Sequence, residues 1–229
     1  MKIFKKISII VIVLLLLTVV SIPAFAMDGE DSIPRYGAST ISSNEKYVYM
    51  QLVEGILCES PKAEITLDPT MGVTVEEMMK GINVFLSDYP ECFWMTNEYS
   101  YACLDSAVHS ITPNYAFIGA DLPHARIMLE NTVNEILSGM TATSDYDKAL
   151  WLHDALAERV TYEQVGHHQT AYGALVDQKA VCAGYAAAYQ LLLNRAGIIA
   201  WTVTGSSYDP QTDELIGQHY LLLNTLIVL

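Results

Sequence analysis

Apolar residues recur at steps of three and four in several segments of the chain, the spacing that places side chains on one face of a helix. The residues that begin and end these segments support this prediction. Pro123 stands at one start, Ser144 and Asp147 are expected to cap another, and Gly197 stands just past one end. The predicted helices cover residues 44–57, 74–90, 123–140, 144–160 and 182–197.

The first two predicted helices each have an expected buried face. In residues 44–57 this face comprises Tyr47, Met50, Val53, Ile56 and Leu57. In residues 74–90 it comprises Val75, Met78, Met79, Ile82 and Phe85. Thr74 and Glu77 stand at the spacing of a capping box, in which each side chain accepts from the backbone N–H of the other residue. The second helix is therefore predicted to begin directly after Thr74.

Strands are predicted where aromatic and β-branched residues gather between turn residues. The stretch "CFWMTNEYSYACL" at residues 92–104 favours a pair of strands. Residues 198–208 and 215–229 favour two further strands, joined by a hairpin loop at 209–214. Residues 170–181 favour a loop with turns. The pattern thus predicts a mixture of helices and hairpins.

The first 26 residues have the organisation of a secretory signal peptide. Three lysines precede an apolar run from Ile7 to Val20, and Ala24, Phe25 and Ala26 form a cleavage site of the A-x-A type. We expect cleavage after Ala26 and a secreted or cell-surface protein. An uncleaved N-terminal anchor is the alternative, although the apolar run is short for a membrane span.

The chain is strongly acidic. Its net charge is −14, and the only charged residues of segment 1–26 are lysines, so cleavage would leave 203 residues with a charge of −17. A surface of this sign repels nucleic acid, and we expect no nucleic-acid partner. A chain of this length is sufficient for one domain with its own core.

Four cysteines follow the predicted signal peptide. Cys92 and Cys103 flank "FWMTNEYSYA", and because two thiols across a hairpin can meet disulfide geometry, this pair is the expected disulfide. Cys58, near a helix end, is expected to be a buried apolar residue, with a Cys58–Cys182 disulfide as a further alternative. No paired metal-ligand spacing is present in the sequence, which argues against structural zinc.

Cys182 stands where an alanine-rich helix begins. Free backbone N–H groups and the positive end of the helix dipole stabilise a thiolate at such a position. The same N–H groups can receive an oxyanion. A structural thiol is the competing interpretation, because unpaired cysteines are commonly buried.

A nucleophilic cysteine requires a base. His219 is the leading candidate, because it lies on the second of the two strands that follow the Cys182 helix. The other five histidines are expected to have structural or solvated roles. In particular, His167 and His168 are expected to be a solvated pair in a loop.

Three stretches that occur in order carry a family resemblance: "YDKALWLHDALAERVTY", "TAYGALVDQKAVCAGYAAAYQLLLNRAGI", and "VTG" ahead of "GQHY". They resemble the transglutaminase-like superfamily, in particular its exported bacterial branch. The resemblance covers residues 145–220, and "DYPECFW" upstream is similar to a segment that often precedes this domain. It implies a papain-like α+β fold, in which a cysteine opens the core helix while a histidine and an aspartate lie on adjacent strands.

By this resemblance Cys182 takes the position of the nucleophile and His219 that of the base. Gln178 lies shortly before Cys182 and is a candidate to offer its amide to an oxyanion, as a glutamine does in papain-like enzymes, although the spacing differs. The expected organisation is a signal peptide at 1–26, a leader with a helical and hairpin region at 27–120, and a transglutaminase-like domain at 121–229.

The sequence departs from the family pattern after His219. The family's aspartate follows its histidine on a further strand, whereas this chain stops at Leu229 and has no acidic residue after Glu214. In addition, "HYLLLN" stands where the family has a HAWN-like stretch. Two explanations are open: a truncated, frameshifted or fragmentary chain that lacks its C-terminal strands, or a degenerate domain that binds without catalysis.

The leading expectation is an exported cysteine acyl-transfer protein that cross-links or hydrolyses amides of peptides or proteins, with activity impaired by the missing aspartate. This chemistry requires no cofactor, and the sequence contains no EF-hand-like run that would indicate calcium. The expected partner is a peptide or protein substrate, including one associated with the cell wall. Contact with a membrane is expected only through an uncleaved signal segment. The alternative is a non-catalytic cell-surface module that binds a peptide or wall polymer.

Overall fold

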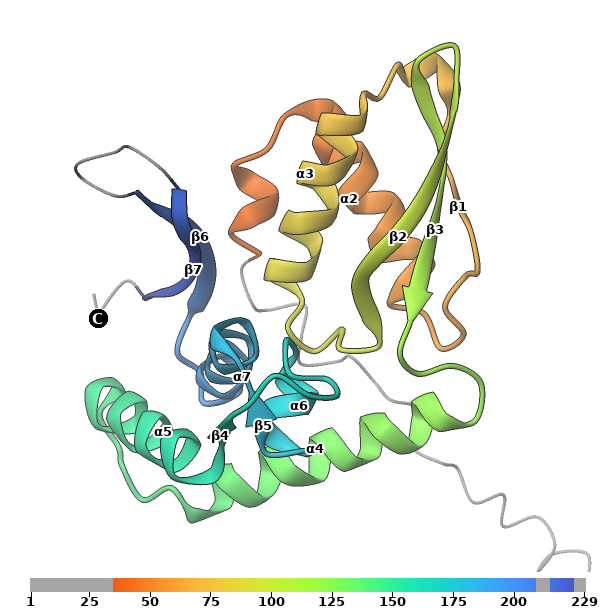
Figure 1. Ribbon diagram of the computed structural model, residues 1–229. Coiled ribbons are helices and arrows are strands. Elements are labelled where there is room, and N and C mark those ends of the chain that lie inside the picture. The colour runs from red at the N-terminus through yellow and green to blue at the C-terminus, as the bar shows by residue number, and fades with distance from the viewer. Residues whose placement is uncertain (1–34, 209–214, 225–229) are drawn as a thin grey trace, which may run out of the picture. The chain divides into compact units, whose positions relative to one another are not determined.

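The computed structural model describes residues 35–208 and 215–224, and for Thr204 and the residues from Ser206 onward it describes the backbone alone. The predicted signal peptide, the loop at 209–214 and residues 225–229 lie outside the described residues. The described part is an α+β structure, in which helices are combined with small sheets (Figure 1). Its helices are α2 (Ser43–Ile56), α3 (Val75–Asp88), α4 (Asp121–Gly139), α5 (Asp145–Arg159), α6 (Ala171–Leu175) and α7 (Cys182–Arg195), with short turns η1 (Gly37–Ser39) and η2 (Pro69–Met71).

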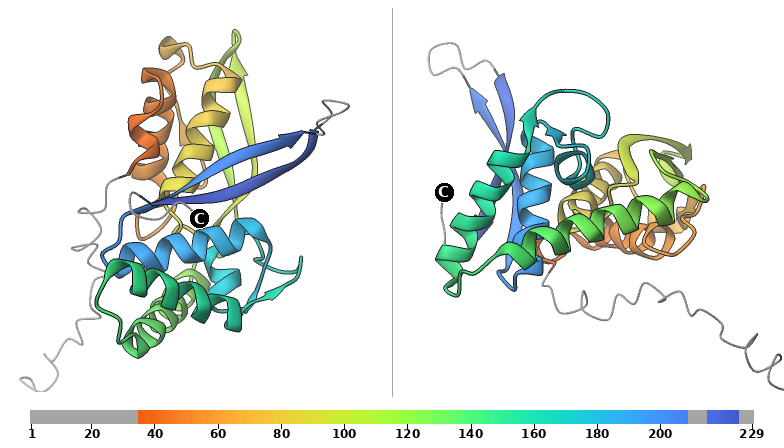
Figure 2. Two further views of the ribbon diagram at one scale, coloured as in Figure 1. Left: turned by 90° about the vertical axis from the view of Figure 1, so that its left-hand side faces the viewer. Right: turned by 90° about the horizontal axis from the view of Figure 1, so that it is seen from below.

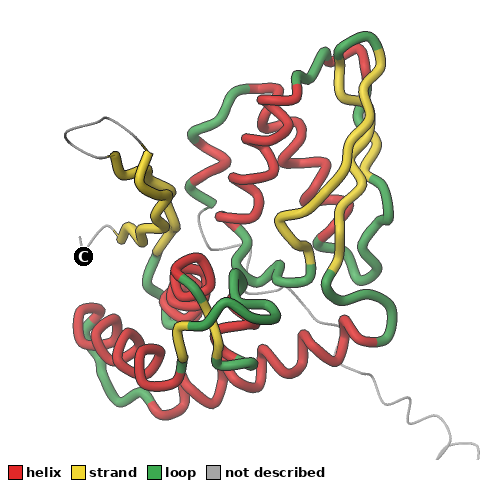
Figure 3. The backbone as a smooth tube through the Cα atoms, in the orientation of Figure 1, coloured by secondary structure: helices red, strands yellow, loops and turns green. Residues whose placement is uncertain are grey.

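The strands of the described residues form three separate sheets (Figure 3). Strands β1 (Ile65–Thr66), β2 (Met95–Leu104) and β3 (Ala107–Tyr115) form an antiparallel sheet in the order β1-β3-β2. Strands β4 (Thr161–Tyr162) and β5 (Lys179–Ala180) pair in parallel. Strands β6 (Ala200–Tyr208) and β7 (Leu215–Asn224) form the predicted antiparallel hairpin.

Helices α2 and α3 begin at capping boxes. The box of Thr74 and Glu77 was predicted, and Ser42 with Glu45 forms a second one ahead of α2. The predicted buried faces are wrong in part, because Met50 and Met79 are 48% and 46% exposed. The side of α2 that meets α3 and β1 is instead lined by Val48, Tyr49, Leu52 and Ile56.

The aromatic stretch at residues 92–104 is one strand and not a hairpin. It contributes β2, and the chain turns only at Asp105 and Ser106, which both have left-handed backbone (φ 48° and 75°). Asp and Ser are residues that tolerate tight turns, and here they fix the turn beyond the aromatic stretch. Cys92 therefore precedes β2, whereas Cys103 lies near its far end opposite Val108.

The expected Cys92–Cys103 disulfide is wrong for this reason, since an extended strand of about 3.3 Å per residue separates the two positions. All four cysteines have free thiols, so the alternative Cys58–Cys182 disulfide is not formed either. Cys92 is buried, Cys58 is half-buried, and Cys103 and Cys182 are exposed. Burial raises the pKa of the Cys92 thiol far above its ordinary value.

The segment at residues 170–181 was predicted to be a loop but contains α6 and β5. The Thr170 side chain accepts from the Gly173 N–H (3.1 Å) and so begins α6, whose five residues are all buried. Ahead of this segment, Ser144 caps α5 as predicted, through the Asp147 N–H (3.1 Å). The short length of α6 gave no helical periodicity to detect in the sequence.

Helix α7 lies at the centre of the C-terminal half. It begins at Cys182, as predicted, and ends before Gly197, whose left-handed backbone (φ 83°) terminates the helix. It packs against α5, α6, β6 and β7, and Figure 2 shows the β6–β7 hairpin beside it. Among the described residues, no helix is long and apolar enough to cross a membrane.

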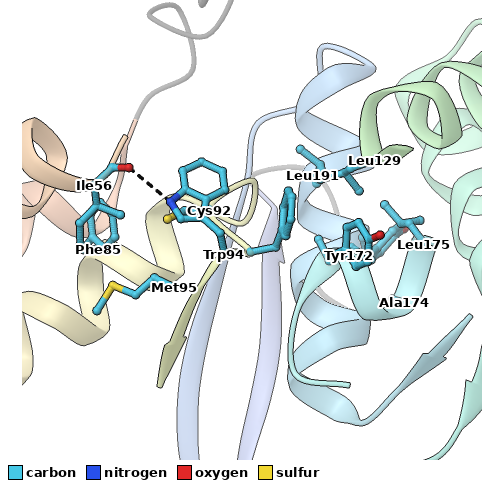
Figure 4. Packing of buried hydrophobic residues seen from close by; sticks show 14 of the residues in the cluster. Ile56, Phe85, Cys92, Trp94, Met95, Leu129, Tyr172, Ala174, Leu175 and Leu191 are labelled. Carbon is cyan, nitrogen blue, oxygen red and sulfur yellow. Dashed lines mark hydrogen bonds between the residues drawn. The ribbon is translucent and has the colours of Figure 1, made fainter. Parts of the chain in front are cut away.

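One core runs across the predicted domain boundary at residue 120. Phe93, ahead of β2, stacks on Tyr172 of α6 with ring centroids 4.8 Å apart. Next to it, the Trp94 Nε1–H donates to the Ile56 carbonyl (3.3 Å), as Figure 4 shows. The boundary itself stays a prediction, while the packing of apolar side chains on its two sides is continuous.

Candidate active site

The first residue of α7 is Cys182, and its side chain is exposed. The preceding residue, Val181, is extended (φ −104°, ψ −176°) and makes no side-chain cap to the helix. No acidic residue lies in the first turn. The Val181 side chain therefore accepts no hydrogen bond from the N–H groups of this turn. The positive end of the helix dipole lies next to the thiol.

The chain reaches Cys182 through a sharp turn at Gln178. Gln178 has left-handed backbone (φ 58°), which is unusual for a residue with a side chain. Its carbonyl accepts from the Thr161 N–H (2.9 Å), and this bond helps to pair β5 with β4. The side chain is exposed, four positions ahead of the thiol. Its role at an oxyanion stays a prediction.

His219 lies on β7, opposite Gly205 of β6. Both strands of this hairpin contact α7, so the structure brings the element that carries His219 against the helix that begins with Cys182. The His219 side chain lies outside the described part, and its pairing with the Cys182 thiol stays a prediction.

A histidine and an aspartate that sequence reasoning did not pair lie close to the start of α7. His167 Nδ1 is 2.7 Å from Asp177 Oδ2. The His167 ring packs against the Phe117 ring, with centroids 4.6 Å apart. The expectation of a solvated histidine pair is therefore wrong, because His167 has a carboxylate partner and His168 has a buried Nε2. The two partners flank α6 and lie in no helix or strand themselves, so no periodic pattern in the sequence could have revealed them.

Two tyrosines near the site have structural hydrogen bonds or ring contacts. Tyr172 is buried against Phe93 and Phe117. Tyr185, one turn after Cys182, donates its hydroxyl to the Val160 carbonyl (2.5 Å), and Tyr162 stacks on its ring at 6.3 Å. Burial raises the pKa of both Tyr172 and Tyr185 above its ordinary value.

The fold and the site together define an α+β domain with an exposed thiol at the start of its central helix. Residues 131–223 match the family model described as transglutaminase-like superfamily, so this part of the chain is a transglutaminase-like domain. The matched segment includes both Cys182 and His219. A comparison with curated proteins finds no match.

Proposed function

We propose that the protein is an exported cysteine acyltransferase or peptidase of the transglutaminase-like kind, with Cys182 as nucleophile and His219 as base. The observation that carries the proposal is the exposed Cys182 thiol at the start of α7, within the segment that matches the family. An exposed thiol next to free helix N–H groups is placed to attack a carbonyl carbon, with those groups at the oxyanion that forms.

The proposed reaction begins when the His219 imidazole takes the Cys182 proton. The thiolate sulfur then bonds to the amide carbon of the substrate, and the carbonyl electrons move to the oxygen. N–H groups of the first turn of α7 stabilise this oxyanion. The oxyanion collapses, the C–N bond breaks, and the leaving amine takes the proton from the imidazolium. Water or a second amine then attacks the thioester carbon and gives a proton to the His219 imidazole. The C–S bond breaks, and the Cys182 sulfur leaves as the thiolate.

The proposed substrates are amides of peptides or proteins, including proteins associated with the cell wall. We propose that residues 1–26 direct export and are removed after Ala26, so that the protein acts in the medium or at the cell surface. N-terminal sequencing of the protein recovered from those fractions tests this part: a chain beginning at Met27 is expected, and a chain beginning at Met1 contradicts cleavage.

The activity is tested with casein as amide donor and a fluorescent primary amine as acceptor, measuring incorporated fluorescence together with new amino termini. We expect one of the two products from the wild-type chain. Cys182→Ala should lower the rate by about 10³-fold or more. His219→Ala should lower it by about 10²-fold or more.

Cys103→Ser is the matched control, because Cys103 is also an exposed free thiol but lies on β2. Its rate should equal that of the wild type. Undiminished activity in Cys182→Ala contradicts the proposal. If the wild type forms neither product and yields no thioester on acid quenching, the non-catalytic binding module becomes the better interpretation.

A further inference from the structure

A loop at residues 163–170 lies against the start of α7. The Val181 N–H, directly ahead of Cys182, donates to the His168 carbonyl (3.0 Å). Gly184, in the first turn of α7, faces the same carbonyl: a Cβ on Gly184 would lie 2.4 Å from the His168 oxygen. Because glycine has no side chain, the loop backbone can contact the first turn of α7 at Gly184, next to the thiol.

Two side-chain pairs tie this loop to the segment that leads into Cys182. One is Glu163 with Lys179 (3.0 Å). The other consists of His167 Nδ1 and Asp177 Oδ2, 2.7 Å apart, with side chains that are 32% and 33% exposed. The loop backbone is also close to α6, because a Cβ on Gly173 would lie 2.1 Å from the His167 oxygen. The His167–Asp177 pair thus joins the segment before α6 to the segment after it. Asp177 is followed directly by the turn at Gln178 and by β5, which lead to Cys182.

We propose that His167 and Asp177 are positioning residues for Cys182. Their contact anchors the 163–170 loop, and the loop in turn supplies the carbonyl that binds Val181 and fixes the first turn of α7. The inference rests on the proposed function, because it gives the pair the role of keeping that thiol reactive. The pair acts through the loop, so it does not replace a carboxylate that would orient His219.

The physical consequence concerns the thiolate. Without the His167–Asp177 contact the loop keeps its Glu163 contacts but loses the anchor next to His168. The His168 carbonyl then moves away from the Val181 N–H, and the first turn of α7 frays. The thiolate then loses the ordered N–H groups and part of the helix dipole, both of which favour the ionised form. The Cys182 thiol should therefore ionise at higher pH and react more slowly at neutral pH.

The test measures the alkylation rate of each cysteine with iodoacetamide in the full chain, from pH 5 to pH 9, by peptide mass spectrometry. In Asp177→Ala we expect the rate at Cys182 to fall about fivefold at pH 7, with the midpoint of its pH profile moved upward. Asp177→Asn keeps an oxygen that can accept from His167, and should restore most of the rate.

Two controls separate this effect from general loss of structure. Cys103, exposed on β2, is an internal reference whose rate should not change. Asp154→Ala removes the carboxylate of a second His–Asp pair, His153 Nδ1 to Asp154 Oδ1 at 3.0 Å on α5, and should leave Cys182 unchanged. If Asp177→Ala does not fold, His167→Ala removes the pair from its other side and should show the same fall in the alkylation rate of Cys182.

If Asp177 acted on Cys182 only through its negative charge, Asp177→Ala would have the opposite effect on the Cys182 pH profile. Negative groups near the thiol oppose ionisation, and Asp177 and Glu163 both lie in this region, the latter paired with Lys179 at 3.0 Å. A downward shift of the Cys182 midpoint in Asp177→Ala, or a wild-type profile, overturns the proposed positioning role. If the wild-type protein is inactive but the Cys182 midpoint still moves upward in Asp177→Ala, the proposed function alone is refuted. If the wild-type protein is active and the midpoint is unchanged in Asp177→Ala, the positioning role of the pair alone is refuted.

Discussion

At the scale of single residues, Asp88 shows how a buried carboxylate is held in this fold. It is the last residue of α3 and only 4% exposed. Its oxygens accept from the N–H groups of Gly37 and Ala38 (both 2.9 Å) and from the Tyr49 hydroxyl (3.2 Å). Burial raises its pKa despite these bonds and the nearby Arg35 guanidinium. Asp88 thus joins the η1 turn to α3, and the free-energy cost of burying it is larger when the carboxylate is charged.

The first prediction concerns Asp88→Asn. An amide has one oxygen, so either Gly37 or Ala38 loses its acceptor, and we expect a loss of about 1–3 kcal/mol in the free energy of unfolding at pH 7. Because the pKa of Asp88 is raised, the folded wild type binds this proton more readily than the unfolded chain. Its stability contribution therefore grows as the pH falls through the folded pKa toward the ordinary value, about 3.9. Urea unfolding of both proteins should show a larger difference at pH 4, near the ordinary value, than at pH 7.

Asp68→Asn is the control for the sign of this effect. Asp68 is exposed, and its hydrogen bonds to Thr70 lower its pKa. Its contribution to stability should shrink as the pH falls through that lowered pKa. If both variants show the same pH trend, the assignment of a raised pKa to Asp88 is wrong.

At the scale of elements, α2 and α3 approach closely at a glycine. A Cβ on Gly81 of α3 would lie 2.8 Å from the Glu45 carbonyl oxygen and 2.9 Å from the Val48 Cβ. Both are atoms that cannot rotate away. The two capping boxes fix where the helices begin, and Gly81 sets how near they pack.

The second prediction is that Gly81→Ala destabilises the protein by about 1–3 kcal/mol, because the added methyl group forces the two helices apart. The matched control is Gly139→Ala at the end of α4, where a Cβ would make ordinary contact with the Trp151 ring at 3.5 Å. That variant should unfold at or above the wild-type temperature. A stabilising Gly81→Ala would contradict the close approach.

Sequence patterns predicted elements better than they predicted faces. The caps at Thr74 and Ser144 and the terminating Gly197 are local signals, and each was found where predicted. The inward placement of Met50 and Met79 failed, since methionine fits either side of an amphipathic helix and only the neighbouring elements decide which side is covered. The hairpin within residues 92–104 failed because the turn residues lie beyond the aromatic stretch.

At the scale of the whole described chain, the aromatic cluster around Phe93 connects the α2–α3 and β2–β3 region to the helices that carry the candidate site. Phe93 is 2% exposed and contacts the rings of Trp94, Phe117 and Tyr172. His167 packs on the same cluster through Phe117. Residues that precede the matched family segment therefore pack against the elements that carry the candidate site.

The third prediction is that Phe93→Ala lowers the free energy of unfolding by about 3–5 kcal/mol through loss of buried apolar contact and creation of a cavity. Tyr146→Ala, at a position that is 64% exposed, is the control and should change stability little. Circular dichroism and tryptophan fluorescence should report one coincident wild-type transition. Two separate transitions would show that the regions on either side of residue 120 unfold independently.

The sequence by itself determined the transglutaminase-like domain, the helix that begins at Cys182 and the two strands that follow it, because periodicity, caps and turn residues act within a few positions of the chain. The tertiary structure alone decided that the cysteines are free and that His167 meets Asp177 across α6. Such meetings depend on how separate elements pack, and residues ten or more positions apart on different elements leave no periodic trace in the sequence.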